Sequence, residues 1–198
     1  EEACRFDEKN AEYMFYAGVA SYLVNDYEKS LDYLQNACTL HPENYDYVYT
    51  YGTVLYRNKQ IEEAIVCFER VLKVDSSHSD AAYYLAKSYI EIHNYEKAIN
   101  LLKMVITNDF TRYDAYFELG NAYMLLHEVN KAIFYLRKCI EIDETYALAY
   151  YYLSKAYLKD ARHDEAIAIL TELKETVPEE EGVVEKNIDV INMLKSLE

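Results

Sequence analysis

Apolar and polar residues follow a pattern along the chain that repeats every 34 residues. The segments 21–34, 88–102 and 122–136 share one order, in which an apolar stretch precedes a polar break and a second apolar stretch. Apolar residues recur at helical spacing on both sides of each break, so each unit is predicted to be a pair of antiparallel helices. Three columns of small or apolar residues recur without an insertion: Ser30, Ala64, Ala98, Ala132 and Ala166; Leu31, Ile65, Ile99, Ile133 and Ile167; Leu34, Phe68, Leu102, Leu136 and Leu170.

The period predicts five repeats between a short N-terminal segment and a terminal helix. The predicted boundaries are a lead-in at 1–10, repeats at 11–44, 45–78, 79–112, 113–146 and 147–180, and a capping helix at 181–198. The segments 40–44 and 74–78 carry Pro, Ser and Asp, which are expected to end one helix and cap the next. The capping helix is expected to cover the last repeat with Val184, Ile188, Ile191 and Leu194.

A further column contains only small residues: Gly18, Gly52, Ala86, Gly120 and Ser154. Small side chains at one position of every repeat allow two helices to approach closely. A helix pair with apolar residues on more than one side cannot bury them alone, so the repeats are predicted to stack on one another. No Gly/Ser-rich or Pro-rich stretch divides the chain, which favours one continuous unit.

The repeat at 113–146 shows the most complete pattern, with Leu119, Gly120, Tyr123, Ala132 and Leu136. A 34-residue helix pair with these residue types at these positions resembles the tetratricopeptide repeat, and the resemblance covers residues 11–180. It implies an all-α fold, a right-handed superhelical α-solenoid of five helix pairs followed by the capping helix. It also implies that the first helices of the repeats line a concave groove, and that the protein binds other proteins.

One departure from the family pattern lies in the turn between the two helices of each repeat. The Gly that is usual there is replaced by Asn25, Lys59, His93, His127 and Ala161. Because Gly adopts a left-handed backbone without steric cost, each replacement is expected to strain the turn slightly. The stacking columns are intact, so the expected fold is unchanged.

In the family, the groove is formed mainly by the second, fifth, ninth, twelfth and thirteenth positions of each repeat. The resemblance therefore implies a partner-binding groove at Phe15, Val19, Tyr22, Tyr49, Thr53, Tyr56, Tyr83, Lys87, Ile90, Phe117, Asn121, Met124, Tyr151, Lys155 and Leu158. The fifth position is aromatic in every repeat, and such a ladder suits an extended peptide or an amphipathic helix of a partner protein. The alternative is that these rings pack between neighbouring repeats.

Other positions refine the expected ligand. A clamp with Lys at a fifth and Asn at a ninth position, used in the family for chaperone tails, is absent from this sequence. Lys87, Arg112, Lys155 and Lys159 are the cations expected on or near the groove, and they favour either an acidic partner segment or a scatter of solvated charges.

Five of the thirteen residues at 146–158 are tyrosine, and the period assigns them different roles. Tyr150 is expected in the core, Tyr157 in a packing column, Tyr151 in the groove ladder and Tyr152 on the flank of the groove.

Composition and charge narrow the function further. The formal net charge is −15, which argues against a nucleic-acid partner, since such binding depends on Lys and Arg. No apolar run approaches the length needed for membrane insertion, and no signal sequence is visible, so we expect a cytoplasmic protein unless a signal has been removed. The four Cys at 4, 38, 67 and 139 show no pairing pattern and are expected to be buried thiols.

The residues predict no catalytic, cofactor or metal site. There is no phosphate-binding Gly loop, and no His/Cys spacing resembles a zinc site. The sequence therefore favours a non-catalytic scaffold that binds a peptide or helix of another protein in an aromatic groove. The alternative is a structural module that self-associates into a homo-oligomer or forms one segment of a larger protein.

Overall fold

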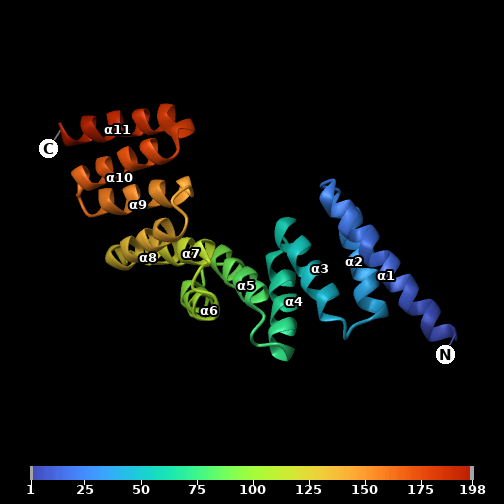
Figure 1. The fold of residues 1–198 in the computed structure, drawn as a ribbon. Coiled ribbons are helices and arrows are strands. Elements are labelled where there is room, and N and C mark those ends of the chain that lie inside the picture. The colour runs from blue at the N-terminus through green and yellow to red at the C-terminus, as the bar shows by residue number, and fades with distance from the viewer. Residues whose placement is uncertain (1, 197–198) are drawn as a thin grey trace. The chain divides into compact units, whose positions relative to one another are not determined.

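The computed structural model describes residues 2–196, and every regular element in this range is a helix (Figure 1). The elements are α1 (Glu2–Leu23), α2 (Tyr27–Leu40), α3 (Tyr45–Arg57), α4 (Ile61–Val74), α5 (Ser79–Glu91), α6 (Tyr95–Asn108), α7 (Tyr113–Leu125), α8 (Val129–Ile142), α9 (Ala147–Lys159), α10 (His163–Thr176), the 3-10 helix η1 (Pro178–Glu180) and α11 (Glu181–Lys195). The predicted all-α class is confirmed. None of the helices in the described range is long and apolar enough to cross a membrane.

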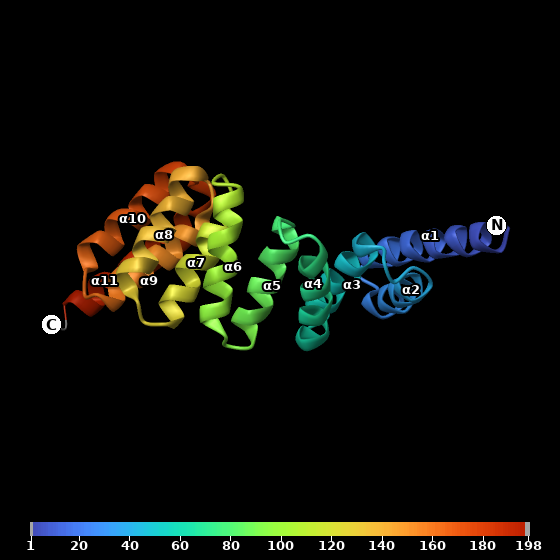
Figure 2. The same cartoon turned by 90° about the horizontal axis from the view of Figure 1, so that it is seen from below.

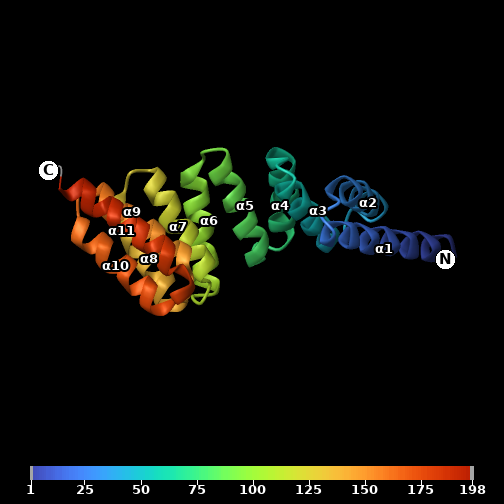
Figure 3. The same ribbon diagram turned by 90° about the horizontal axis from the view of Figure 1, so that it is seen from above.

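The helices α3, α5, α7 and α9 begin 34 residues apart. The first helix is different, because α1 has 22 residues where α3 has 13, so residues 2–10 continue the first helix of the array. In Figure 3, α1 extends past α2 toward the N-terminus. The side chains of residues 2–9, which include Cys4, and of Leu194 lie outside the described part.

The contacts divide the chain into two compact units, Glu1–Leu101 and Leu102–Glu198, where the sequence favoured one continuous unit. The boundary falls inside α6. In the first unit, each helix from α1 to α4 packs against the next helix in the chain. In the second unit, helices α7 to α11 pack in the same consecutive manner, and η1 contacts both α10 and α11 (Figure 2).

The core is formed by the columns that the period predicts. Every residue of two columns is fully buried: Ser30, Ala64, Ala98, Ala132 and Ala166, and Leu34, Phe68, Leu102, Leu136 and Leu170. Burying one Leu or Phe side chain contributes about 1.5–3 kcal/mol, so these columns supply a large part of the stability of each helix pair. The capping helix buries Val184 and Ile191.

The helices of a pair approach closely at the small-residue column, as predicted. A Cβ atom added to Gly18 would lie 2.6 Å from Cγ of Leu34, and one added to Gly120 would lie 2.5 Å from Cγ of Leu136. Ser30 also uses this proximity, because its hydroxyl donates a hydrogen bond of 2.8 Å to the carbonyl oxygen of Gly18. The two small columns therefore meet in the first repeat, and a Cβ atom at Gly18 or Gly120 would require a shift of the neighbouring Leu.

The turns within the repeats have the left-handed backbone that the family pattern implies. The φ angles are 60° at Asn25, 63° at Lys59, 62° at His93, 60° at His127 and 55° at Ala161. An L-residue in this conformation costs roughly 1–2 kcal/mol, less for Asn. The predicted strain is therefore present in every turn, and it is greatest where the residue has no polar side chain.

Helix caps form in the connections between repeats. Asn44 caps α3, and its side-chain oxygen accepts a hydrogen bond from the amide of Tyr47. Ser and Asp were expected to cap α5, but His78 does so, with Nδ1 accepting from the amide of Ala81 at 3.1 Å. Asp75 instead closes the loop by accepting hydrogen bonds from the amide and hydroxyl of Ser77.

Candidate partner-binding site

In the first unit, the predicted groove positions carry rings that pack against other rings. The ring of Phe15 stacks on Tyr47 at 4.5 Å between centroids, and that of Tyr22 lies 6.0 Å from Tyr27. Tyr49 lies 5.0 Å from His78. Because these rings contact other side chains of the protein, the contacts support the alternative that the rings pack between neighbouring repeats.

Tyr84 is the centre of the largest ring cluster in the first unit. It stacks on Phe68 at 5.8 Å and meets Tyr49, Tyr56 and Tyr83 at 6.2, 5.8 and 5.7 Å. Tyr56, a predicted groove residue, is buried as a result.

Four further groove residues complete the first unit. Lys87 lies over two rings, with its ammonium 5.3 Å from the centroid of Tyr83 and 5.9 Å from that of Tyr56. Thr53 donates its hydroxyl proton to the carbonyl of Tyr49. Val19 and Ile90 are half-buried. The groove positions of this unit are therefore filled largely by their own side chains.

In the second unit, the two fifth-position rings are also engaged. Phe117 is only 8% exposed, because Tyr146 and Tyr152 meet its ring edge-on at 5.3 and 4.9 Å. Tyr151 donates its hydroxyl proton to the carboxylate of Glu180 in η1 at 2.8 Å. Burial, followed by this hydrogen bond, raises the pKa of Tyr151 to about 12.

The remaining groove residues of the second unit line an open pocket. It has a volume of about 370 Å³ and lies between α7 and α9. Its lining consists of Asn121, Met124, Leu125, Tyr152, Lys155, Leu158 and Lys159. Four of these seven are predicted groove residues, at the ninth and twelfth positions of two neighbouring repeats. The floor is mainly apolar, and two ammonium groups and one amide supply its polar part.

The two lysines of the pocket are available for a ligand. The ammonium of Lys155 lies 5.1 Å from the ring centroid of Tyr152, and neither Lys155 nor Lys159 has an ion-pair partner among the described residues. They lie four residues apart on α9, so they occupy the same face of that helix. In an acidic chain, two unpaired cations beside an apolar floor favour a ligand that is apolar and negatively charged.

Family models match three segments of the sequence. Residues 24–105 match the model of the anaphase-promoting complex, cyclosome, subunit 3, and residues 113–146 and 148–179 match two models of the tetratricopeptide repeat. The chain contains tetratricopeptide repeats. No curated protein matches the sequence.

Solved structures of tetratricopeptide repeat proteins share the fold. MamA 41-end from Desulfovibrio magneticus RS-1 is 22% identical, with a TM-score of 0.79 over 84% of this chain and 94% of that one. TTC0263, a thermophilic tetratricopeptide repeat protein in Thermus thermophilus, is 18% identical, with a TM-score of 0.69 over 92% and 99%. YrrB, whose structure is described as having an unusual peptide-binding site, is 19% identical, with a TM-score of 0.71 over 89% and 91%. At these identities the likeness is one of fold.

Leu125, Lys159 and Tyr152 line the pocket but were not among the fifteen residues assigned to the groove. Lys159 was expected on or near the groove as a cation, and both Leu125 and Lys159 occupy the thirteenth position of their repeats, so the family pattern contained the signal for both. Tyr152 was expected only on the flank of the groove, and the ring of Phe117 holds it against the pocket. Tyr150 and Tyr157 are buried, which confirms their predicted packing roles.

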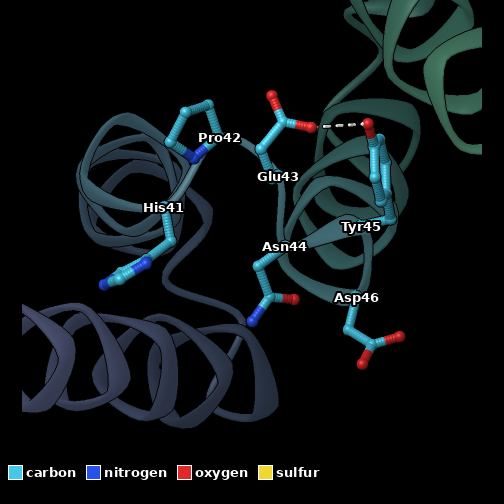
Figure 4. A pocket seen from close by; sticks show the side chains of 6 residues that line it. All are labelled: His41, Pro42, Glu43, Asn44, Tyr45 and Asp46. Atoms are coloured by element: carbon cyan, nitrogen blue, oxygen red, sulfur yellow. Dashed lines mark hydrogen bonds between the residues drawn. The ribbon is translucent and has the colours of Figure 1, made fainter.

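A larger hollow, of about 590 Å³, lies at the connection between the first two tetratricopeptide repeats (Figure 4). Six consecutive residues line it, from His41 to Asp46. Its polar groups are partly used within the loop, since Tyr45 donates to the carboxylate of Glu43 at 2.9 Å and Asn44 caps α3. No predicted groove residue contributes to it, so the α7–α9 pocket is the stronger candidate.

The described cysteines are thiols without a disulfide. Cys67 and Cys139 are buried and Cys38 is half-buried. Burial raises the pKa of Cys38 to about 11 and the pKa of Cys67 and Cys139 to about 12. A thiol with so high a pKa is a poor nucleophile at neutral pH, which gives these residues a packing role.

Proposed function

We propose that this chain is a non-catalytic scaffold whose α7–α9 pocket holds a segment of a partner protein. The segment has an apolar side chain next to one or more carboxylates. The observation that carries the proposal is the pocket itself, because it combines predicted groove positions with two unpaired lysines. Its titratable side chains are Tyr152, Lys155 and Lys159, with no carboxylate or imidazole, which favours binding over acid–base chemistry.

The chemistry of the lining defines the expected ligand. Met124, Leu125 and Leu158 can bury an apolar side chain, and Met adapts to irregular shapes. Lys155 and Lys159 can pair with carboxylates at the rim, and Asn121 can hydrogen-bond to a peptide group. Because the rest of the chain is acidic, these lysines would give the pocket selectivity as well as affinity.

A labelled peptide with Leu or Phe between Asp residues tests the proposal by fluorescence polarisation. The same peptide with Lys in place of Asp is expected to bind at least about tenfold more weakly. Lys155→Glu/Lys159→Glu should reverse this preference. The matched control, Lys73→Glu/Lys97→Glu, makes the same change in net charge away from the pocket and should leave it intact.

Two results would contradict the proposal in different ways. If neither peptide binds, an apolar, acidic segment is the wrong ligand. If the acidic peptide binds equally well to wild type and to Lys155→Glu/Lys159→Glu, binding occurs outside the α7–α9 pocket.

A further inference from the structure

The groove side of α9 meets a fixed carboxylate near its N-terminal end. Tyr151, at the fifth position of its repeat, donates its hydroxyl proton to Glu180 of η1 at 2.8 Å. Both side chains are half-buried, and the preceding residue, Glu179, is exposed. Neither glutamate has an ion-pair partner among the described residues. The 3-10 helix therefore brings unneutralised negative charge to a position that the family pattern assigns to the groove.

The same helix carries positive charge further along. Lys155 and Lys159 follow Tyr151 by four and eight residues, so the three lie along one side of α9. At 1.5 Å per residue, the Cα atoms of the lysines lie about 6 and 12 Å from that of Tyr151 along the helix axis. Both lysines line the α7–α9 pocket, and neither has an ion-pair partner among the described residues. The groove side of α9 is therefore negative toward its N-terminal end and positive toward its C-terminal end.

Cations on the neighbouring helices do not cancel the negative charge, because they are already paired. Lys174 of α10 contacts the carboxylates of Glu181 and Glu185 at 2.8 and 2.7 Å. Arg112, at the start of α7, pairs with Asp114 at 2.9 Å. These ion pairs use the positive charge of both side chains, so the carboxylate at Tyr151 keeps its own charge.

Carboxylates at the lysine end are paired in the same way. Asp160, which follows Lys159, lies 3.8 Å from Arg162. Glu128, in the turn after α7, forms an ion pair with Lys131. The unpaired charges along the groove side of α9 are therefore negative at one end and positive at the other.

We infer that the partner segment held by the α7–α9 pocket is bipolar, with carboxylates at Lys155 and Lys159 and a basic side chain at Glu180. This inference rests on the function proposed for the pocket. A groove with opposite charges at its ends favours a segment of matching polarity and rejects the reversed one, because like charges then meet. In an extended segment, which rises about 3.3 Å per residue, a span of about 6–12 Å corresponds to two to four residues. Glu180 thus determines specificity in addition to holding η1 against α9.

Labelled peptides that differ at one position test the inference by fluorescence polarisation. The reference is the peptide with Leu between two Asp residues. Two further peptides carry Lys three residues before or after this core, and two others carry Glu at the same places. One of the Lys peptides should bind about threefold more tightly than the reference, and its Glu counterpart about threefold more weakly, because that position lies at Glu180. The side that responds gives the direction in which the segment lies in the groove.

Removing the negative charge of η1 should abolish both effects. In Glu179→Gln/Glu180→Gln, the amide oxygen can still accept the proton of Tyr151, so affinity for the reference peptide should change little. Glu180→Lys should reverse the preference between the Lys and Glu peptides. The matched control, Glu62→Gln/Glu63→Gln, removes two consecutive exposed carboxylates from the first turn of α4 and should retain both effects. Circular dichroism establishes that each variant is folded.

The outcomes separate this inference from the proposal on which it rests. If the reference peptide binds but neither Lys nor Glu on either side changes its affinity, the bipolar segment is wrong, and the pocket remains a site for an acidic, apolar segment. If the preference for Lys persists in Glu179→Gln/Glu180→Gln, the basic side chain binds elsewhere and the inference is also wrong. If the reference peptide does not bind, both the inference and the proposed ligand of the pocket fail.

Discussion

The two compact units present the same repeat positions but fill them differently. In the first unit, Tyr56 occupies the twelfth position and packs against Tyr84, so the groove side of the helices is closed by rings. In the second unit, Met124 and Leu158 occupy that position and line an open pocket. The small-residue column behind the groove is alike in both units. The two units thus differ in the side chains at this repeat position, with a packed ring at Tyr56 and pocket-lining aliphatic groups at Met124 and Leu158.

The largest expected effect on stability comes from removing the aromatic ring at the sixth position of one repeat in each unit, Tyr84 in the first unit and Tyr152 in the second. Tyr84 contacts four rings, whereas the ring of Tyr152 contacts Phe117 and Lys155. Tyr84→Ala should lower the free energy of unfolding by roughly 3 kcal/mol, and Tyr152→Ala by roughly 1 kcal/mol. Urea denaturation followed by circular dichroism measures both. If both variants lose the same free energy of unfolding, the ring contacts of Tyr84 do not stabilise the first unit more than those of Tyr152 stabilise the second.

The next effect tests whether the two units really share the helix contact behind the groove. A Cβ at Gly52 would meet Cβ of Cys67 at 2.9 Å, and one at Gly120 would meet Cγ of Leu136 at 2.5 Å. Gly52→Ala and Gly120→Ala should each destabilise by about 1–3 kcal/mol. Gly182→Ala is the control, because nothing lies within 4 Å of its Cβ position, and it should be neutral or stabilising. If only one of these two variants loses little free energy of unfolding, the close helix contact differs between the two units.

Making the second unit resemble the first is expected to close its pocket. Leu158→Tyr places a ring at the twelfth position, as Tyr56 does in the first unit. Affinity for the acidic, apolar peptide should fall about tenfold, or about 1.4 kcal/mol, while the free energy of unfolding changes little. Ile90→Tyr makes a similar change at the twelfth position of the third repeat and should leave affinity unaltered. Unchanged affinity of Leu158→Tyr would place the ligand elsewhere.

The contrast between the units also shows which features the sequence could predict. The core columns and the close helix contacts depend on one position facing the same neighbour in every repeat, so periodicity alone identified them. The pocket depends on how side chains from different helices fill the space together. Phe117 illustrates this limit, because Tyr146, from the connection before α9, helps to cover a ring that the family pattern places in the groove.

The exposed apolar residues of α1 and α11 could be identified only from the structure, for a related reason. Tyr13 and Ala20 occupy the same repeat positions as buried residues of α5 and α9, so the period predicts that they are buried. The structure shows that both are exposed, because no described helix covers them. Likewise, Val190 and Met193 belong to a helix whose opposite side caps the array. Exposure of an apolar residue is a property of its neighbours, and these are known only once the helices are placed.

The smallest expected effect compares the left-handed turn residues of the two units. Ala161, in the second unit, has φ of 55° and no polar side chain, whereas Asn25, in the first unit, has φ of 60° and belongs to a residue type that adopts this conformation more readily. Ala161→Gly should raise the free energy of unfolding by about 1 kcal/mol, and Asn25→Gly by only a few tenths, since Gly relieves the strain but also gives the unfolded chain more freedom. Thermal denaturation of both variants checks the difference. Equal gains would mean that the side chain of Asn25 does not ease its turn, and a loss at Ala161 would mean that the entropy of the unfolded chain outweighs the strain.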